Sequence, residues 1–367
     1  MRSLGMKLLT FAVVAITAAP VFAQSDTRAA KADVVIELRP SKIVKSPLGT
    51  KMHFAEQLAA ISQAPGAPGF SDLERVFAGL VAPATSENLG AIQTGEKNDL
   101  QFFARLEFGS AESASKMLEQ MKLGSEDKVE KNGKTYHSAP KGTNMPAGTV
   151  MFLVNDKVVE LASEGFAYRT NEMPFTDALA TAWKAMPDSA LKVSADGVNA
   201  RGLLESLAKE GKKNAGGNPI AGALIDLLPT MDNINFSLDL ASANLLTLNM
   251  VGSDEDKATD INDGFQALLT FAKPSAKQGL TMIEQHAPTP AAVFGKLVDG
   301  MAVKREGKSV TLNIPRPEGF EGAVAEALPI IQGFVLRMML ESGGLGGPGV
   351  PGGPGQPNGN VMPSGDF

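Results

Sequence analysis

The sequence predicts an α+β protein made of two tandem copies of an antiparallel sheet with helices packed on one face. Four sequence blocks recur in the same order along the chain, which indicates an internal repeat. Within these blocks, alternating apolar runs typical of strands are interspersed with apolar residues at helical spacing. The chain has no cysteine, so the fold has no disulfides. Hydrophobic residues make up 43% of the chain, which is enough to form a stable core without them. We expect the first copy to span residues 30–187 and the second to span residues 188–340.

The clearest pair of blocks predicts a strand followed by a helix in each copy. The stretch "DLQFFARLEFGSAESASKMLEQM" begins at Asp99, and "NLLTLNMVGSDEDKATDINDGFQALL" begins at Asn244. In both stretches an alternating apolar run precedes Gly-Ser, a short acidic stretch and apolar residues at helical spacing. Gly109 of the first stretch therefore falls opposite Gly252 of the second.

Further blocks extend the match in both directions along the chain. They pair "ADVVIELRPSKIVKS" from Ala32 with "ALKVSADGVNARGLL" from Ala190, "GFSDLERVFAGLVAP" from Gly69 with "GNPIAGALIDLLPTM" from Gly217, and "KVEKNGKTYHSA" from Lys128 with "AVKREGKSVTLNI" from Ala302. The blocks from Gly69 and Gly217 predict helices that end near a proline. In the first of them, Ser71 and Glu74 have the spacing of a helix capping box. The second copy carries about 30 extra residues around 273–300, which we expect to form a loop and an added helix.

Each copy is thus predicted to run as strand, helix, helix, strand, helix and hairpin. In the first copy a second hairpin follows, "TVMFLVNDKVVELAS" from Thr149, in which Asn155-Asp156 separates two alternating apolar runs. The second copy ends instead in an almost continuously apolar helix from Ala323 to Leu340, interrupted by Pro329. Such a helix suits a membrane surface or an oligomer contact, but packing over its own sheet explains the same pattern and is what we expect.

The N-terminal segment, residues 1–23, is predicted to be an export signal. Arg2 and Lys7 supply its positive region, Leu8 to Ala19 its apolar core, and Val21-Phe22-Ala23 a small-residue cleavage pattern. A membrane anchor is the alternative, but a spanning helix needs roughly 20 apolar residues and this run is shorter. We therefore expect export to the periplasm or the extracellular space after cleavage near Ala23.

The C-terminal segment, residues 341–367, is predicted to be a disordered Gly/Pro-rich tail. From Gly343 the stretch "GGLGGPGVPGGPGQP" repeats Gly-X-Y with frequent proline, as collagen does. The run is too short to rely on for a triple helix, so a tail that cannot bury enough apolar surface to order itself is the expected state.

Composition narrows the function classes. The formal charge is −6 and no long basic run occurs, which argues against a nucleic-acid partner. One Trp, two Tyr and three His argue against a sugar-stacking cleft or a His-rich metal surface. Without cysteine the chain has no thiolate nucleophile and no Cys-ligated metal.

The stretch "AVKREGKS", residues 302–309, loosely fits a phosphate loop, but its flanks do not. A phosphate loop leads into a helix N-terminus, whereas here "VTLNIPRP" follows, which alternates as a strand does. We therefore predict a hairpin that turns at Glu306-Gly307 and does not bind ATP or GTP. The corresponding stretch of the first copy has Asn132-Gly133, a preferred hairpin turn, at the same point.

The densest acidic stretch, Gly252 to Asp263, could indicate a calcium site. The EF-hand spacing that starts at Asp254 is broken at Ala258, however. A helix start accounts for the same residues, with Ser253 as the N-cap and with Asp254 and the two acidic residues after it in the first turn.

No other candidate chemistry emerges. His53, His137 and His286 lie far apart in sequence and form no metal-binding spacing, so we expect surface or capping roles for them. The G-x-S-x-G nucleophile motif is missing, and dispersed carboxylates cannot be paired from sequence. We assign no catalytic, cofactor-binding or metal-binding residue and expect no cofactor.

The stretch "ADVVIELRP", the later "SPLG", the Gly-Ser-acid-helix blocks and the "NGKTYH" hairpin together resemble uncharacterised exported proteins of planctomycete-type bacteria. The resemblance covers residues 30–335. It implies a signal peptide, a duplicated α+β region and a low-complexity tail, and it carries over no activity or catalytic residue.

The sequence therefore favours a secreted or periplasmic, non-enzymatic binding or scaffold protein with an unknown protein or envelope partner. One alternative is a periplasmic carrier of an apolar ligand such as a lipid, held between sheet and helices. The other is a hydrolase with dispersed carboxylates.

Overall fold

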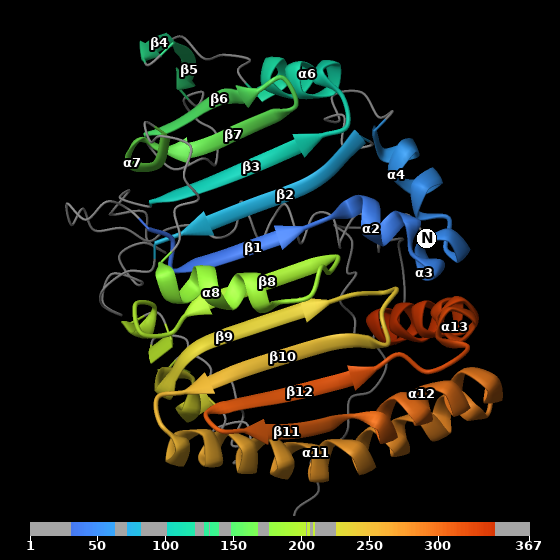
Figure 1. Ribbon diagram of the computed structural model, residues 1–367. Coiled ribbons are helices and arrows are strands. Elements are labelled where there is room, and N and C mark those ends of the chain that lie inside the picture. The colour runs from blue at the N-terminus through green and yellow to red at the C-terminus, as the bar shows by residue number, and fades with distance from the viewer. Residues whose placement is uncertain are drawn as a thin grey trace, which may run out of the picture.

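The computed structural model describes most of the chain between residues 31 and 341 (Figure 1). The described residues are 31–62, 72–81, 101–121, 128–131, 133–138, 148–167, 176–202, 204–205, 208–209 and 225–341. The expected signal segment, residues 1–23, and all but the first residue of the expected tail, 341–367, lie outside them.

The described strands form a single antiparallel sheet of 12 strands. The strands are β1 (Val34–Leu38), β2 (Leu73–Leu80), β3 (Phe102–Phe108), β4 (Lys128–Lys131), β5 (Lys134–Ser138), β6 (Thr149–Asn155), β7 (Val158–Ser163), β8 (Leu191–Asp196), β9 (Met231–Leu238), β10 (Asn244–Gly252), β11 (Ala302–Glu306) and β12 (Ser309–Pro315). The helices are α2 (Pro40–Lys45), α3 (Pro47–Lys51), α4 (Phe54–Ser62), α6 (Ala111–Met121), α7 (Glu164–Ala167), α8 (Asp177–Ala185), the 3₁₀ turn η2 (Leu228–Thr230), α11 (Glu255–Glu284), α12 (Pro288–Gly300) and α13 (Phe320–Glu341). The predicted α+β class with a large antiparallel sheet is thus confirmed.

The strand order is β11-β12-β10-β9-β8-β1-β2-β3-β7-β6-β5-β4. At its middle β1 pairs with β8, and Ile36 lies opposite Val193. Strands from residues 30–187 and from residues 188–340 therefore share one sheet. The hairpin β11–β12 lies next to β10, as the hairpin β6–β7 lies next to β3. By its place in the sheet, the hairpin β11–β12 corresponds to the hairpin of residues 149–163. The sequence comparison had paired it instead with the stretch from Lys128.

The helix predicted over residues 69–83 is wrong. Residues 73–80 of this block form β2, a central strand paired with β1 and β3. Apolar side chains on both faces of β2, such as Val76 and Phe77, are needed on a strand covered from both sides, and such a run cannot be distinguished from a helix by spacing. Glu74 lies in this strand, so it forms no capping box; Ser71 lies outside the described residues.

In the matching block from Gly217 the structure describes residues 225–231. A short helical turn leads into η2, and β9 begins at Met231. The strand β9 was not predicted, although its residues alternate between apolar and polar as those of a strand do.

Helices lie on both faces of the sheet, not on one as predicted. Residues directly opposite each other on paired strands share a face. We call the face that carries Glu37 and Lys192 the front face, and the face that carries Ile36 and Val193 the back face. In Figure 1, α8 crosses in front of β8. The reason is that the front face of the strands from residues 30–187 also carries large apolar side chains, such as Phe77 and Phe103, which have to be covered.

The core clusters confirm this arrangement. On the front, Leu179 and Trp183 of α8 belong to one cluster with Phe77 of β2 and Phe103 of β3. On the back, α6 packs with Met117 and its neighbours against β2, β3 and β7. Helix α11 packs on the back of β10 and β12 through Ala258 and Ile261.

The acidic stretch from Gly252 starts a helix, as predicted, with the cap one residue later than expected. Asp254 is the N-cap residue and accepts a hydrogen bond from the backbone N–H of Lys257, while Glu255 and Asp256 lie in the first turn. The extra residues of the second half lengthen α11 and add α12.

The expected tight turns close hairpins. Gly133 and Gly307 both have a positive φ, 72° and 57°, which glycine adopts without strain. The hairpin β11–β12 confirms that "AVKREGKS" continues into a strand and not into a helix. The Asn155 hairpin is also present, with β7 starting at Val158; Asn132 lies outside the described residues.

Helix α13 begins against other helices at one end of the sheet. Phe320 and Val324 cluster with Leu48 of α3 and with Phe294 of α12. The helix continues through Pro329 to Glu341. Within the described ranges, no helix has the length and apolar character needed to cross a bilayer.

Candidate functional site

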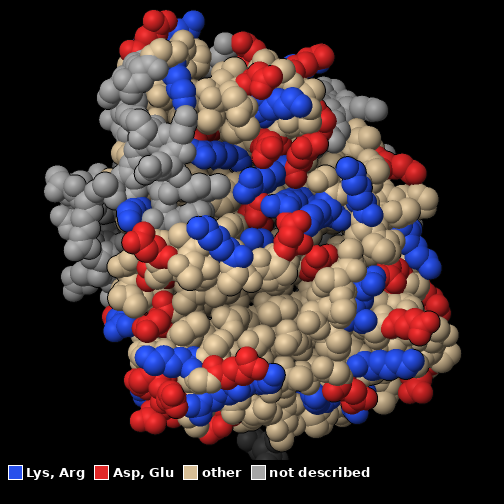
Figure 2. Space-filling model, in the orientation of Figure 1, with Lys and Arg blue, Asp and Glu red and all other residues tan. Residues whose placement is uncertain are grey.

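A dense group of charged side chains lies on the front face, in the upper half of the view in Figure 2. It follows one cross-strand row, in which Lys192, Glu37, Phe77, Arg105 and Glu160 lie successively opposite one another on β8, β1, β2, β3 and β7. We call this row and its charged neighbours the charged belt. Its charged members are Glu37, Arg39, Lys42, Arg75, Arg105, Glu107, Glu160, Asp188 and Lys192.

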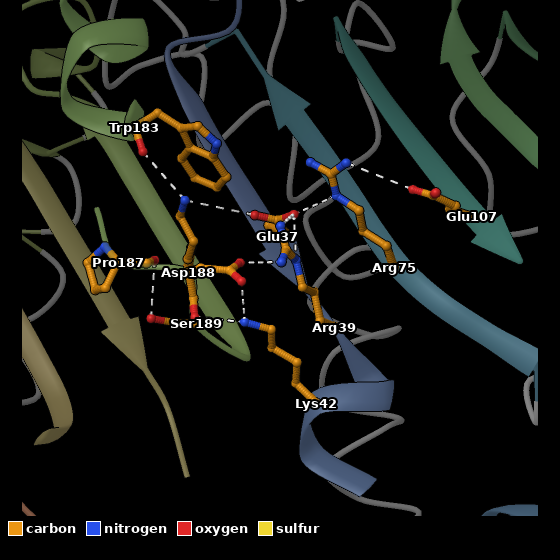
Figure 3. Close-up of polar contacts among 10 residues, drawn as sticks. Glu37, Arg39, Lys42, Arg75, Glu107, Trp183, Pro187, Asp188 and Ser189 are labelled. Atoms are coloured by element: carbon orange, nitrogen blue, oxygen red, sulfur yellow. Dashed lines mark hydrogen bonds and ion pairs between the residues drawn. The ribbon is translucent and has the colours of Figure 1, made fainter. Parts of the chain in front are cut away.

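Glu37 lies at the centre of the belt (Figure 3). Only 1% of its surface is exposed. Its Oε1 lies 2.9 Å from Nη2 of Arg39 and 2.5 Å from Nε of Arg75. Its Oε2 lies 4.0 Å from Nζ of Lys192 and makes no hydrogen bond. One buried carboxylate therefore compensates three cations, which come from three adjacent strands or their ends.

Asp188 and Trp183 hold the cations on the β8 side of the belt. Asp188 pairs with Arg39 and with Lys42, whose Nζ lies 2.6 Å from Oδ2. The hydrogen bond from Lys42, with the nearby Arg39 guanidinium, lowers the pKa of Asp188. Lys192 lies over the Trp183 ring, with Nζ 4.3 Å from its centroid, and donates to the Trp183 carbonyl. Burial lowers the pKa of Lys192, and the Glu37 carboxylate opposes that shift.

The other end of the belt is the pair of Arg105 and Glu160. Arg105 donates from Nε to Glu160 Oε2 at 2.5 Å. Glu160 is almost fully buried, and this burial raises its pKa above the ordinary value despite the Arg105 guanidinium. Two guanidinium groups of the belt make cation–π contacts with aromatic rings of the same face: Arg75 lies over Phe77, and Arg105 lies over Phe103.

Replacing Glu160 by Gln should change how stability depends on pH. A raised pKa means that the folded protein binds the Glu160 proton more tightly than the unfolded chain does. The contribution of Glu160 to stability therefore increases as the pH falls from 7 towards the ordinary carboxyl range, and the variant lacks this contribution. Thermal melts from pH 4 to pH 7 should show that the melting temperature of wild type, measured relative to that of E160Q, falls as the pH rises.

The matched control is Glu112→Gln on α6. Glu112 is exposed, and its pKa is lowered by the hydrogen bond from Lys116. The pH dependence should have the opposite sign for this pair: the stability of wild type relative to that of E112Q should increase as the pH rises. If E160Q and E112Q show the same trend, the assigned effect of burial on Glu160 is wrong.

On β8, β9, β10 and β12 the front face carries uncharged polar side chains. We call these the polar ladder: Ser194, Asn235, Ser237, Thr247, Asn249, Ser309, Thr311 and Asn313. Ser194 donates to Asn235 at 2.5 Å, and Asn249 donates to Ser309 at 2.6 Å and to Thr311 at 3.0 Å. Thr247 donates to Asn313 at 3.0 Å. The ladder continues the rows of the charged belt across β8, β9, β10 and β12.

The histidines named from the sequence do not come together into a described cluster. His53 precedes α4 and pairs with Glu56, His137 is buried in β5, and His286 follows α11. Among the residues that the structure describes, no group of three or more His, Asp or Glu could hold a metal ion.

The charged belt was missed by reasoning from the sequence. Its signal is charged residues at alternating positions within apolar strands, as in "VVIELR" and "FFARLEF". Arg75 could not be included, because its segment was predicted to be a helix. The partners are also distant in sequence, since Lys42 and Asp188 are 146 positions apart.

No protein-family model and no curated protein match the chain. Among solved structures, crystal form I of TP0453 matches with 11% identity and a TM-score of 0.36, over 81% of this chain and 94% of that one. Crystal form III matches with 12% identity and a TM-score of 0.37, over 83% and 98%. Crystal form IV matches with 10% identity and a TM-score of 0.37, over 80% and 92%.

Proposed function

We propose that the protein is an exported, non-enzymatic binding or scaffold protein, and that the front face of the sheet is its binding surface. The observation that carries this proposal is the continuity of the charged belt with the polar ladder across one sheet. Both are held by neighbouring strands, so the polar groups are positioned before any partner arrives, which lowers the cost of binding.

The chemistry of the charged belt supports binding over catalysis. Glu37, Glu160 and Asp188 each lie within ion-pair distance of an Arg or Lys. A carboxylate paired in this way holds its cations in fixed positions. Glu160, whose pKa burial raises, is almost fully buried, so a substrate has little access to its carboxyl group. Arg39, Arg75 and Arg105 keep between 25% and 30% of their side-chain surface exposed, so they can still contact a partner.

We also propose that the two halves of the sheet are copies of one unit. Outward from the central pair, the order is β1-β2-β3-β7-β6 on one side and β8-β9-β10-β12-β11 on the other. In both halves a helix follows the third strand, α6 after β3 and α11 after β10. On this proposal the polar ladder and the charged belt are diverged versions of the same surface.

A photo-crosslinking amino acid at Thr247, which is half-buried in the polar ladder, tests the proposed surface in cells that produce the protein naturally. We expect one discrete crosslinked product identifiable by mass. The same group at Lys277, exposed on α11, serves as the control and should not give that product. The proposal is overturned if Thr247 gives no product, or gives the same products as Lys277.

The carrier of an apolar ligand is a second candidate, because one observation favours it. On β9 the polar residues of the front are buried, whereas the apolar residues of the back are only half-buried. The half-buried apolar side chains of the back face include Ile36, Val193, Phe236, Leu246, Leu312 and Ile314. They lie on adjacent strands and would suit a lipid chain.

Native purification followed by organic-solvent extraction and mass spectrometry tests the carrier. A lipid at one equivalent per chain supports it, provided that Phe236→Asp on the back abolishes the lipid and Thr247→Asp on the front does not. A lipid-free protein, or equal loss in both variants, contradicts it.

A further inference from the structure

Among the strands that the structure describes, the sheet ends at β4, a short strand in which Val129 lies between Lys128 and Glu130. In the strand order β4 is the last strand and follows β5 (Figure 1). Lys128, Val129 and Glu130 are all exposed, and Val129 is 45% exposed although it is a large apolar residue. An exposed edge strand presents backbone N–H and C=O groups to which another strand can add.

The register of the β4–β5 hairpin decides which backbone groups face this edge. Lys131 lies opposite Lys134 at the two-residue loop, so this pair exchanges both backbone hydrogen bonds. Such pairs alternate with non-bonded pairs along an antiparallel ladder. The backbone of Val129, opposite Tyr136, therefore also points towards β5. The backbone groups of Lys128 and Glu130 point outward.

We propose that β4 pairs with β4 of a second copy of this chain, antiparallel and about a two-fold axis at Val129. In this register Lys128 lies opposite the partner's Glu130, and Glu130 lies opposite the partner's Lys128. These are the residues whose backbone groups point outward, so both pairs can exchange backbone hydrogen bonds. The exposed Val129 then contacts the partner's Val129.

Charge excludes the neighbouring symmetric registers. An axis at Lys128 places Lys128 opposite the partner's Lys128, and an axis at Glu130 places Glu130 opposite the partner's Glu130. Like charges directly opposite on paired strands are destabilising. An axis between two residues would place an outward-facing residue opposite one that faces β5, where no hydrogen bond forms. Lysine commonly guards edge strands against such pairing, but here each Lys meets a Glu.

The dimer would join two 12-stranded sheets edge to edge, so that their front faces form one continuous surface. The pairing strand has only four residues, so the association should be weak and dependent on concentration. It goes beyond the proposed binding function, since it supplies the partner copy without using the charged belt or the polar ladder.

Charge reversal in sedimentation velocity runs over a range of concentrations tests the proposal. The protein as secreted by an expression host should form dimers as its concentration rises. Lys128→Glu alone places Glu opposite Glu, and Glu130→Lys alone places Lys opposite Lys. Each single variant should associate about tenfold more weakly than wild type.

Two combinations make the test specific for the register. The double variant K128E/E130K restores opposite charges and should dimerise like wild type. An equimolar mixture of K128E and E130K should form a heterodimer, because every cross-strand pair is again Lys with Glu. Lys277→Glu on α11 is the control for altered net charge and should leave association unchanged.

Thermal melts of all variants check that the fold is intact. The proposal is overturned if wild type stays monomeric at every concentration, if the single variants dimerise as wild type does, or if the mixture of the two fails to associate.

Discussion

Replacing Glu37 by Leu is expected to lower the free energy of unfolding by roughly 3–5 kcal/mol. Glu37 is 1% exposed, and its carboxylate compensates Arg39, Arg75 and Lys192. The substitution leaves these cations without their central anion. The effect on Lys192 is the largest, because its side chain is only 8% exposed. Its ammonium group cannot reach water without breaking its contact with the Trp183 ring.

The measurement is urea unfolding followed by far-UV circular dichroism, with the slope of the transition used to check that the unfolded state is unchanged. The matched control is Glu107→Leu, on the same face. Glu107 is 42% exposed and lies 3.8 Å from Nη1 of Arg75, so its loss should cost about 0–1 kcal/mol. Equal losses for the two variants would show that burial does not distinguish Glu37.

Features that depend on local sequence could be predicted. The start of α11 follows from acidic residues that cap the helix within its first turn, such as Asp254. The hairpin at Gly307 follows from a turn that needs a positive φ, flanked by alternating residues. The added helix α12 follows from the extra residues of the second half.

Features that depend on contacts between distant segments could not be predicted. Strand β2 is apolar on both faces because α8 covers its front and α6 its back, and spacing alone suggests a helix. Strand β1 pairs with β8 and so joins the two halves into one sheet, but nothing in the sequence of either strand indicates this pairing. Without the positions of β2 and β8, Arg75 and Lys192 could not be brought together with Glu37 into a candidate site.

Replacing Phe103 by Ala should cost about 3–5 kcal/mol. Phe103 is 1% exposed, and its ring centroid lies 5.4 Å from those of both Phe77 and Phe166. Truncation would leave a cavity at the middle of the largest front-face cluster, where α7 and α8 meet the sheet. The matched control is Phe271→Ala on α11, which is 56% exposed and should change stability by less than about 0.5 kcal/mol.

The same variant shows whether the two halves unfold together. Trp183, the single tryptophan, packs against Phe77 in the first-half core, so its fluorescence reports on that core, whereas circular dichroism reports on the whole sheet. Because β1 and β8 pair along their full length and α8 also contacts β9, we expect one cooperative transition. Phe103→Ala should then shift the fluorescence and circular dichroism curves equally. A shift in fluorescence alone would mean that the shared sheet does not couple its halves, and that the front face is two surfaces joined at β1 and β8.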